Sequence, residues 1–148
     1  MSEIKNPKEH FGSKKIPYSY VPAGVLAGLA VAMYEGKKYG RHNYRVIGDI
    51  AASIYYDALK RHIDAWWEGE DTDPDSKVGL SHLVKAMACL AVLYDAKMMG
   101  KMRDDRPPKL PEGWMNELNE MVVKLNEKVG YVEPFTAEGE AAKARDIG

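Results

Sequence analysis

The chain has 148 residues, of which 45% are hydrophobic and 29% charged, and these proportions are typical of one soluble globular domain rather than of a disordered or fibrous protein. Its 21 Lys and Arg and 22 Asp and Glu give a formal net charge of -1, which excludes an overall field favouring nucleic acid or anionic membrane. The single cysteine, Cys89, excludes an intrachain disulfide framework and a thiolate zinc site. A polar N-terminus without a secretory or membrane-spanning apolar run indicates a cytoplasmic protein.

The first half of the chain predicts two helices separated by a basic loop. Pro22 suits a first helical turn, and apolar residues recur at helical spacing after it, which predicts a helix over about 22–35. Residues 36–48 contain three glycines and four basic residues, so we expect a loop there. Asp49 is a good N-cap candidate for a second helix, which ends before Gly69. The residues expected to face a core from this helix are Ile50, Ile54, Leu59, Ile63 and Trp66.

The second half predicts two more helices. Residues 69–79 are acidic and rich in turn formers, and we expect a loop. Apolar residues at offsets of three and four predict a third helix from about Leu80 to Lys97, and a similar pattern from Trp114 to Val129 predicts a fourth after a proline-rich break. The predicted fold is therefore all-α, a four-helix bundle-like single domain over 1–148 with flexible segments at about 1–15 and 131–148. Apolar residues on more than one helix face favour a homo-oligomer, a dimer or tetramer.

The basic loop carries groups that suit a nucleotide. Its cations can contact phosphate oxygens, and arginine can make paired donor contacts that lysine cannot. Its aromatic and amide side chains can stack on, or hydrogen-bond to, a base, although a charge run of this kind is usually only a solvated loop. The residues concerned are Lys37, Lys38, Tyr39, Arg41, His42, Asn43 and Arg45. The chain has no Walker-type loop, GxGxxG or GxSxG motif, so the common kinase, dinucleotide and serine-hydrolase classes are not indicated.

Carboxylates and imidazoles gather around the acidic loop. On the second predicted helix, Asp57, Arg61, Asp64 and Glu68 share one stripe, which predicts either a solvated face of weak ion pairs or a metal-binding wall. His62 lies on the apolar side of that helix, where a lone histidine is more often a structural group than a ligand. The loop then adds Glu70, Asp71, Asp73 and Asp75, and His82 follows it.

Oxygen ligands of this kind suit Mg2+, and nearby imidazoles suit Mn2+. A calcium loop is not indicated, because the glycine and terminal glutamate that it requires are missing.

With these residues in view, the chain resembles the phage-type dATP/dGTP diphosphohydrolases, a branch similar to the all-α MazG-like nucleotide pyrophosphohydrolases. The resemblance covers roughly Lys14 to Pro107 and rests on five segments in the same order and with compatible spacing. They are KKIPYSYVP, KKYGRHNY, DALKRHIDAWWEGEDTDPDS, GLSHL and DDRP. Two features depart from the related patterns. The chain has no EExxE motif, and Lys85 stands where we would expect a second histidine, after an apparent two-residue insertion.

The resemblance implies hydrolysis of a purine deoxynucleoside triphosphate, dGTP or dATP, to the monophosphate and pyrophosphate with Mg2+ or Mn2+, in bacteriophage nucleotide metabolism. We expect the acidic residues Glu68, Glu70 and Asp73 to be catalytic. The expected metal ligands are His62, Glu70, Asp73 and His82. The expected substrate-binding residues are those of the basic loop together with Arg61.

Two other functions stay open at this stage. Paired histidines and aspartates could form a metal phosphohydrolase of the HD type, although Arg61 to Asp64 contain no adjacent His-Asp pair. A non-catalytic helical phage protein could instead bind a nucleotide or a host partner through the same loops. No membrane or nucleic-acid partner is expected for any of these functions.

Overall fold

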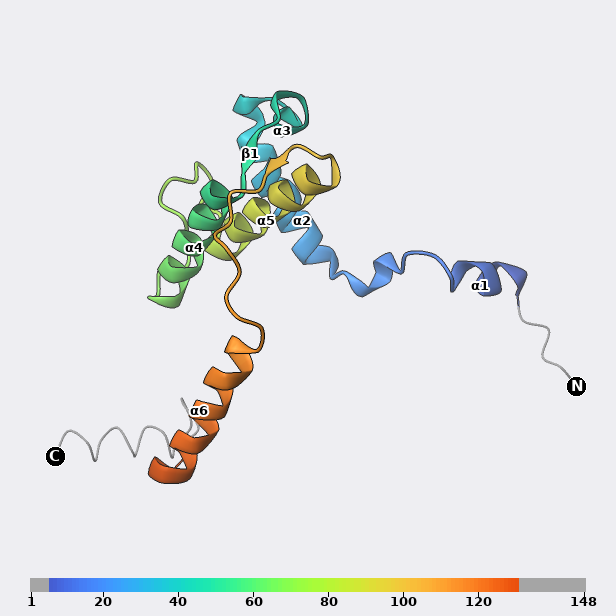
Figure 1. The fold of residues 1–148 in the computed structure, drawn as a ribbon. Coiled ribbons are helices and arrows are strands. Elements are labelled where there is room, and N and C mark those ends of the chain that lie inside the picture. Colours follow the sequence, from blue (N-terminus) through green and yellow to red (C-terminus); the bar gives the residue numbers. More distant parts are fainter. Residues whose placement is uncertain (1–5, 131–148) are drawn as a thin grey trace, which may run out of the picture. The chain divides into compact units, whose positions relative to one another are not determined.

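The computed structural model describes residues 6–130, which are mainly helical and divide between two compact units, Met1–Arg106 and Pro107–Gly148. The elements of the first unit are α1 (Pro7–Gly12), η1 (Tyr18–Tyr20), α2 (Ala23–Glu35), η2 (Gly36–Tyr39), α3 (Asn43–Ile47), β1 (Ile50–Ala51), α4 (Ala52–Trp67), α5 (His82–Met98) and β2 (Met102–Arg103) (Figure 1). The second unit contains α6 (Trp114–Val129). The all-α prediction is confirmed, and the two-residue strands, which pair in parallel, are a small addition to it.

The centre of the first unit is the packing of α5 against both α4 and α2. Small residues allow this close approach. A Cβ atom placed on Gly28 of α2 would lie 3.4 Å from a methyl group of Val84 on α5, whereas a Cβ atom on Gly24, one turn earlier, would meet nothing within 4 Å. Among residues 6–130, the buried apolar residues are likewise mostly alanines: Ala32, Ala51, Ala52, Ala86 and Ala96, with Tyr44 as the one larger side chain.

The matched glycines of α2 give a test of this packing. Gly28→Leu is expected to lower the free energy of unfolding by roughly 1–3 kcal/mol, because the added atoms must displace Val84. Gly24→Leu is expected to leave stability unchanged or to raise it by up to about 1 kcal/mol through helix propensity. Urea unfolding followed by circular dichroism measures both. Equal effects of the two substitutions would contradict close packing at Gly28.

The predicted core faces differ from the observed ones. Ile54 and Ile63 of α4, both expected to face the core, are exposed in the single chain, whereas Ile50, Leu59 and Trp66 are half-buried; Leu90 of α5 is exposed as well. Alanines occupy the buried positions instead, because helices that pack closely leave room between them for small side chains rather than for branched ones. Large apolar side chains are consequently left on the surface of the first unit.

The start of α4 corrects one prediction. Asp49 is not the N-cap: it has a φ of 53° and forms an ion pair with Arg103, at 2.7 Å. The helix begins at Ala52, and its first turn is capped from a distance by Asp105, which accepts hydrogen bonds from the Ser53 backbone N–H at 2.8 Å and the Ser53 hydroxyl at 2.5 Å. The beginning of α4 is therefore tied to the DDRP segment, next to the β1–β2 pair.

The two functional loops are more ordered than predicted. The expected loop over 36–48 contains η2 and α3, so its residues are held in short helical turns. The acidic loop between α4 and α5 is closed by backbone hydrogen bonds from Asp73 N to Leu80 O (2.8 Å) and from His82 N to Asp71 O (3.0 Å). The Ser81 side chain then caps α5 by accepting from Leu83 N. Both loops therefore present their side chains from a defined backbone.

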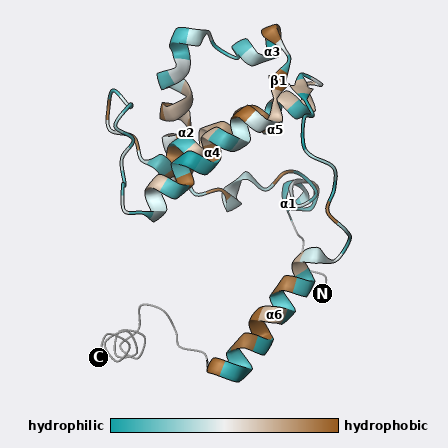
Figure 2. Cartoon of the chain, turned by 60° about the vertical axis from the view of Figure 1, so that its left-hand side comes forward, coloured by the Kyte–Doolittle hydropathy of each residue, from teal (hydrophilic) through white to brown (hydrophobic). Residues whose placement is uncertain are grey.

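In the second unit, α6 coincides with the fourth predicted helix and is strongly amphipathic. Hydrophobic and hydrophilic residues alternate along it in Figure 2. Its apolar residues are exposed, among them Leu118, Val122 and Leu125. The predicted flexible segment 131–148 lies outside the described residues.

Candidate active site

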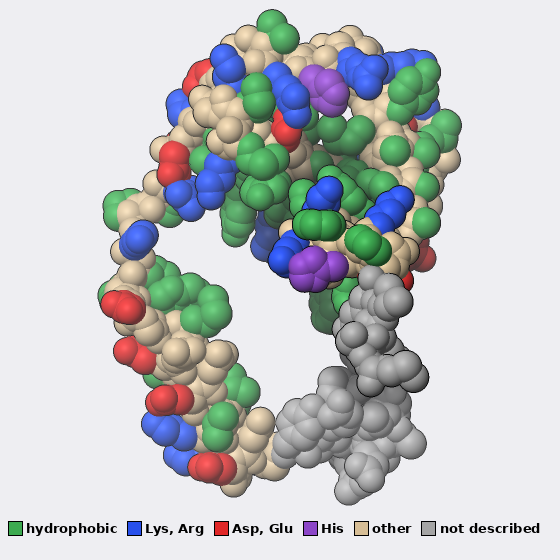
Figure 3. All heavy atoms as spheres, turned by 90° about the vertical axis from the view of Figure 1, so that its right-hand side faces the viewer, with side chains coloured by type: hydrophobic (Ala, Val, Ile, Leu, Met, Phe, Trp, Pro, Cys, Tyr) green, Lys and Arg blue, Asp and Glu red, His purple; other side chains and the backbone are tan. Residues whose placement is uncertain are grey.

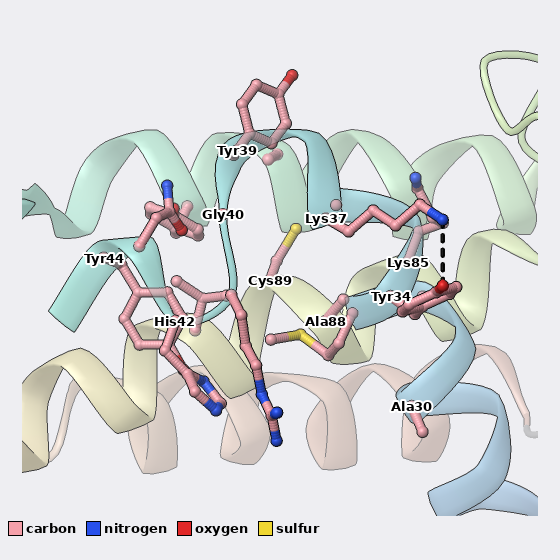
Figure 4. Close-up of a pocket in the computed structure, with 18 of the residues that line it drawn as sticks. Ala30, Tyr34, Lys37, Tyr39, Gly40, His42, Tyr44, Lys85, Ala88 and Cys89 are labelled. Carbon is pink, nitrogen blue, oxygen red and sulfur yellow. Dashed lines mark hydrogen bonds between the residues drawn. The ribbon is translucent and has the colours of Figure 1, made fainter. Parts of the chain in front are cut away.

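A cavity of about 1000 Å³ opens in the first unit between the basic loop and the helices α2, α4 and α5. From the basic loop, the residues that line it are Gly36, Lys37, Tyr39, Gly40, Arg41, His42, Asn43 and Tyr44. The facing wall contributes His62 from α4 and Lys85 and Cys89 from α5. Figure 4 shows Lys37 and Lys85 near Tyr34 at one end of the cavity, and His42 and Tyr44 at the other. In Figure 3, Lys, Arg and His side chains lie among hydrophobic ones around a hollow.

The cavity combines positive charge with aromatic surface. The Lys37 ammonium group donates a hydrogen bond to the Tyr34 hydroxyl at 3.1 Å and lies 4.3 Å from the ring centroid of the same tyrosine. Lys85 and Arg41 add two more cations to the lining. A volume of this size with a few cationic groups suits a nucleotide, whose base and phosphates need these two kinds of surface.

Three predicted substrate-binding residues do not line the cavity. Lys38 projects over the ring of Tyr39, at 4.9 Å from its centroid. Arg45 forms a bidentate ion pair with Asp95 at 2.6 and 2.7 Å, which joins α3 to α5. Arg61 is also absent from the lining. Arg45 therefore has a structural contact, and the cavity is lined by the members of the basic loop other than Lys38 and Arg45 that were predicted to bind substrate.

The Arg45–Asp95 pair predicts an acid-sensitive stability. Hydrogen bonding to Arg45 lowers the pKa of Asp95 below its ordinary value of 3.8. Because the folded-state pKa is the lower one, the pair stabilises the protein fully above the unfolded-state pKa, and this contribution is lost as the pH falls below about 4. Asp95→Asn is expected to reduce stability at pH 7 and to flatten its dependence on pH between about 5 and 3. Urea unfolding across this range measures it; an unchanged slope would contradict the assignment.

His62 and His82 form a hydrogen-bonded chain that ends at Glu70. The two Nδ1 atoms are 2.9 Å apart, and His82 Nε2 lies 2.7 Å from Glu70 Oε1. A carboxylate can only accept, so His82 donates from Nε2; with neutral rings, its Nδ1 then accepts from Nδ1–H of His62. This order leaves the Nε2 lone pair of His62 free. Burial lowers the pKa of His62, which favours the neutral ring.

A second cluster joins the acidic loop to α2 and α5. Glu35, at the end of α2, accepts from Lys85 Nζ, Ser76 Oγ and Lys77 N, each at 2.8 Å. Lys85 Nζ also lies 3.6 Å from Asp73 Oδ2, and Asp73 is only 6% exposed. Hydrogen bonds from Lys85 and Ser76 lower the pKa of Glu35 to about 2. Burial alone would lower the pKa of Lys85, but the two carboxylates outweigh it and raise that pKa.

Within the described part of the chain, the carboxylates of Asp64 and Glu68 form no hydrogen bond or ion pair with these clusters. Glu68 is the C-terminal cap of α4, and its backbone N–H donates to Asp64 O at 3.0 Å. The carboxylate of Asp64 is exposed and paired with Lys60 one turn away, which is the solvated-face arrangement. This part of the stripe therefore contributes weak surface pairing rather than a wall of the cavity.

Three of the four predicted metal ligands, His62, Glu70 and His82, are linked by hydrogen bonds, and His62 keeps one free ring nitrogen. Both ring nitrogens of His82 have partners, and Asp73 lies beside an ammonium group. Between residues 6 and 130, no group of three or more His, Cys, Asp or Glu side chains has the geometry to hold a metal ion. As arranged here, these residues do not fit a divalent ion, and an ion would require some of them to change partners.

Sequence reasoning missed Glu35 and Lys85 as parts of this site. Lys85 lies one helical turn after His82, and this spacing could have placed the two on the same side of α5. Glu35 gave no comparable signal, because its partners lie 41 to 50 residues further along the chain. Tyr34 and Tyr55, two further lining residues, were also not predicted to belong to the site.

A comparison with protein-family models shows to which family the chain belongs. Residues 5–106 match a family model described as dATP/dGTP diphosphohydrolase, N-terminal. The chain belongs to this family. The match confirms the resemblance and includes every residue of the cavity and of the two clusters. No curated protein and no solved structure matches the chain.

Membership of the dATP/dGTP diphosphohydrolase family indicates a hydrolase that acts on nucleotides. The cations and aromatic groups of the cavity are compatible with such a substrate. Throughout the described part of the chain, no helix is long and apolar enough to cross a membrane.

Proposed function

We propose that this protein hydrolyses a purine deoxynucleoside triphosphate, dGTP or dATP, to the monophosphate and pyrophosphate. The observation that carries the proposal is the cavity, because Lys37, Arg41 and Lys85 line it together with aromatic groups, in the part of the chain that matches the family. Lys85 is already paired with Glu35 and Asp73, so Lys37 and Arg41 are the cations that can offset part of the charge of a triphosphate, and the rings of Tyr39 and His42 can stack on a base.

The reaction requires water to attack the α-phosphorus while pyrophosphate leaves. Lys37 and Arg41 would hold the phosphate chain and offset the charge that develops on the leaving group. Neutral His62 has a free Nε2 lone pair at the cavity wall, so it can accept a proton from the attacking water. His82 and Glu70 would hold His62 in this tautomer. Asp73 and Glu68 stay proposed catalytic residues, with Asp73 the better placed through its contact with Lys85.

Mg2+ or Mn2+ is the proposed cofactor. Such an ion, when bound, would add positive charge to the phosphates and lower the pKa of a bound water. The family resemblance supports this proposal, whereas the present partners of His82 and Asp73 do not offer a ready site. The ion's ligands would therefore come from a rearranged set.

We further propose that the protein acts as a homo-oligomer in the cytoplasm of a phage-infected host, with the helices of several copies completing a bundle. Exposed apolar side chains on α2, α4 and α5 support association, because large uncovered apolar surface is unusual in a stable monomer. Light scattering coupled to size exclusion should give a dimer or tetramer; a monomer at micromolar concentration would reject the oligomer.

The reaction is tested by incubating the purified protein with each deoxynucleoside triphosphate, with and without Mn2+, and separating the products. Monophosphate and pyrophosphate in equal amounts are expected for dGTP or dATP. Nucleoside plus triphosphate would instead indicate an HD-type phosphohydrolase. Tight nucleotide binding without any product would indicate a non-catalytic binding protein.

A further inference from the structure

We propose that α6 is a self-association element, which pairs with α6 of a second copy of this chain in an antiparallel arrangement. The helix begins at Trp114, beyond the residues that match the family, so the cavity and its chemistry do not account for it. The inference concerns α6 alone. It depends neither on the proposed reaction nor on association through the first unit.

The apolar residues of α6 form one stripe that is exposed in the single chain. They recur at intervals of three and four residues, which places them on one side of a helix. The members of this apolar stripe are Trp114, Leu118, Met121, Val122, Leu125 and Val129. All except Trp114 are more than half exposed, and Figure 2 shows hydrophobic positions repeating along the helix. An exposed stripe along a helix of 16 residues suits a partner that is itself a long apolar surface.

The charges beside the apolar stripe favour a second copy of α6 as that partner. Glu117, Lys124 and Lys128 border one edge of the stripe, which we call the charged edge, whereas Asn119 and Asn126 border the other. Within residues 6–130, neither Glu117 nor Lys124 belongs to an ion pair. Two opposite charges are therefore available along the same edge of the helix, about two turns apart.

Only an antiparallel pair brings these charges together. In a parallel pair, the charged edge of one helix would face the uncharged edge of the other. In an antiparallel pair, like edges face each other, so Glu117 of each copy can lie opposite Lys124 of the other and two ion pairs can form. The midpoint between these positions falls beside Met121, near the middle of the apolar stripe. One alignment therefore covers both stripes and pairs the charges.

The pair of helices is a small interface, so we expect it to add to other contacts between copies rather than to replace them. Its geometry is tested by cross-linking the full chain at high protein concentration with a short bismaleimide, after Cys89→Ala removes the natural thiol. With Met121→Cys, the two thiols lie close to the two-fold axis and should cross-link efficiently. With Val129→Cys, they lie about 25 Å apart along the axis, at about 1.5 Å per residue, and should not.

The two cysteine positions separate the possible arrangements. A parallel pair would cross-link both variants, and binding of the apolar stripe to the first unit instead of to a second α6 would cross-link neither. Either result would overturn the proposal. A natural chain that fails to hydrolyse nucleotides would reject the proposed function and leave the cross-linking result unaffected.

Charge reversal tests the pairing in the Met121→Cys background. Glu117→Lys places like charges opposite each other and should lower the cross-linked fraction at least about threefold. Adding Lys124→Glu reverses both charges and should restore it. Glu120→Lys, the same change away from the charged edge, is the matched control and should leave the fraction unchanged. Equal losses with Glu117→Lys and Glu120→Lys, or no recovery in the double variant, would show that these charges do not align the helices and would contradict antiparallel pairing.

Discussion

Replacing Arg41 by alanine is expected to lower kcat/KM for dGTP or dATP by roughly 10–100-fold, the loss that one charge-assisted hydrogen bond to a phosphate accounts for. Arg41 lines the cavity beside His42, and in the described residues no acidic side chain holds it in an ion pair, so its guanidinium group is available to a ligand. Steady-state kinetics over a range of substrate concentrations measures the effect. If the loss is mainly in KM, Arg41 serves binding; if it is mainly in kcat, Arg41 acts in the transition state.

Lys38→Ala is the matched control for this prediction. Lys38 belongs to the same basic loop and carries the same charge, but it projects over the ring of Tyr39 and does not line the cavity. Its replacement should change kcat/KM by less than about threefold, the size of a screened surface-charge effect. If Lys38→Ala were as damaging as Arg41→Ala, the substrate would respond to the charge of the whole loop, and the cavity would not be its binding site.

Replacing His82 by alanine is expected to lower the free energy of unfolding by roughly 2–4 kcal/mol, through a cavity and the loss of buried hydrogen bonds. His82 is only 4% exposed, and its ring links His62 on α4 to Glu70 in the acidic loop. The expected loss is therefore large for a single polar residue. Urea unfolding at pH 7.5 measures it.

His10→Ala provides the comparison for His82. His10 lies on the short helix α1, is exposed, and contacts Lys14 through its ring at 3.4 Å. Its removal should change the free energy of unfolding by no more than about 0.5 kcal/mol. Equal stability of the two variants would mean that the His62–His82–Glu70 chain does not hold α4 and α5 together.

Helix positions were predicted well because they depend on local patterns. The helices predicted at about 22–35, 80–97 and 114–129 are present as α2, α5 and α6, with ends that agree within a few residues. Apolar residues three and four apart define these helices, and glycines end several of them. The predicted start of α4 was wrong. Asp49 is a suitable N-cap by residue type, but its carboxylate pairs with Arg103, and the first turn of the helix is capped by Asp105 instead.

The core faces were predicted less well, since a hydrophobic residue on a helix does not reveal which neighbour will cover it. Leu90 and Ile54 fit a helical period, yet in the single chain they are exposed, while alanines such as Ala86 and Ala96 occupy the contacts between helices. A helix with apolar residues on several faces leaves this choice to packing. The pattern therefore determined that these segments are helices but not which side of each is buried.

By itself, the sequence determined the helical class, the family, and the gathering of basic residues before α4 and acidic residues after it, because all three are local in the chain. Only the tertiary structure decided which of those residues meet. It placed Lys37 and Arg41 in the cavity, turned Arg45 to Asp95, and joined Glu35 to Lys85 across 50 residues of sequence. Pairing over such distances depends on how α2, α4 and α5 pack, and the spacing of residues within any one segment does not reveal that packing.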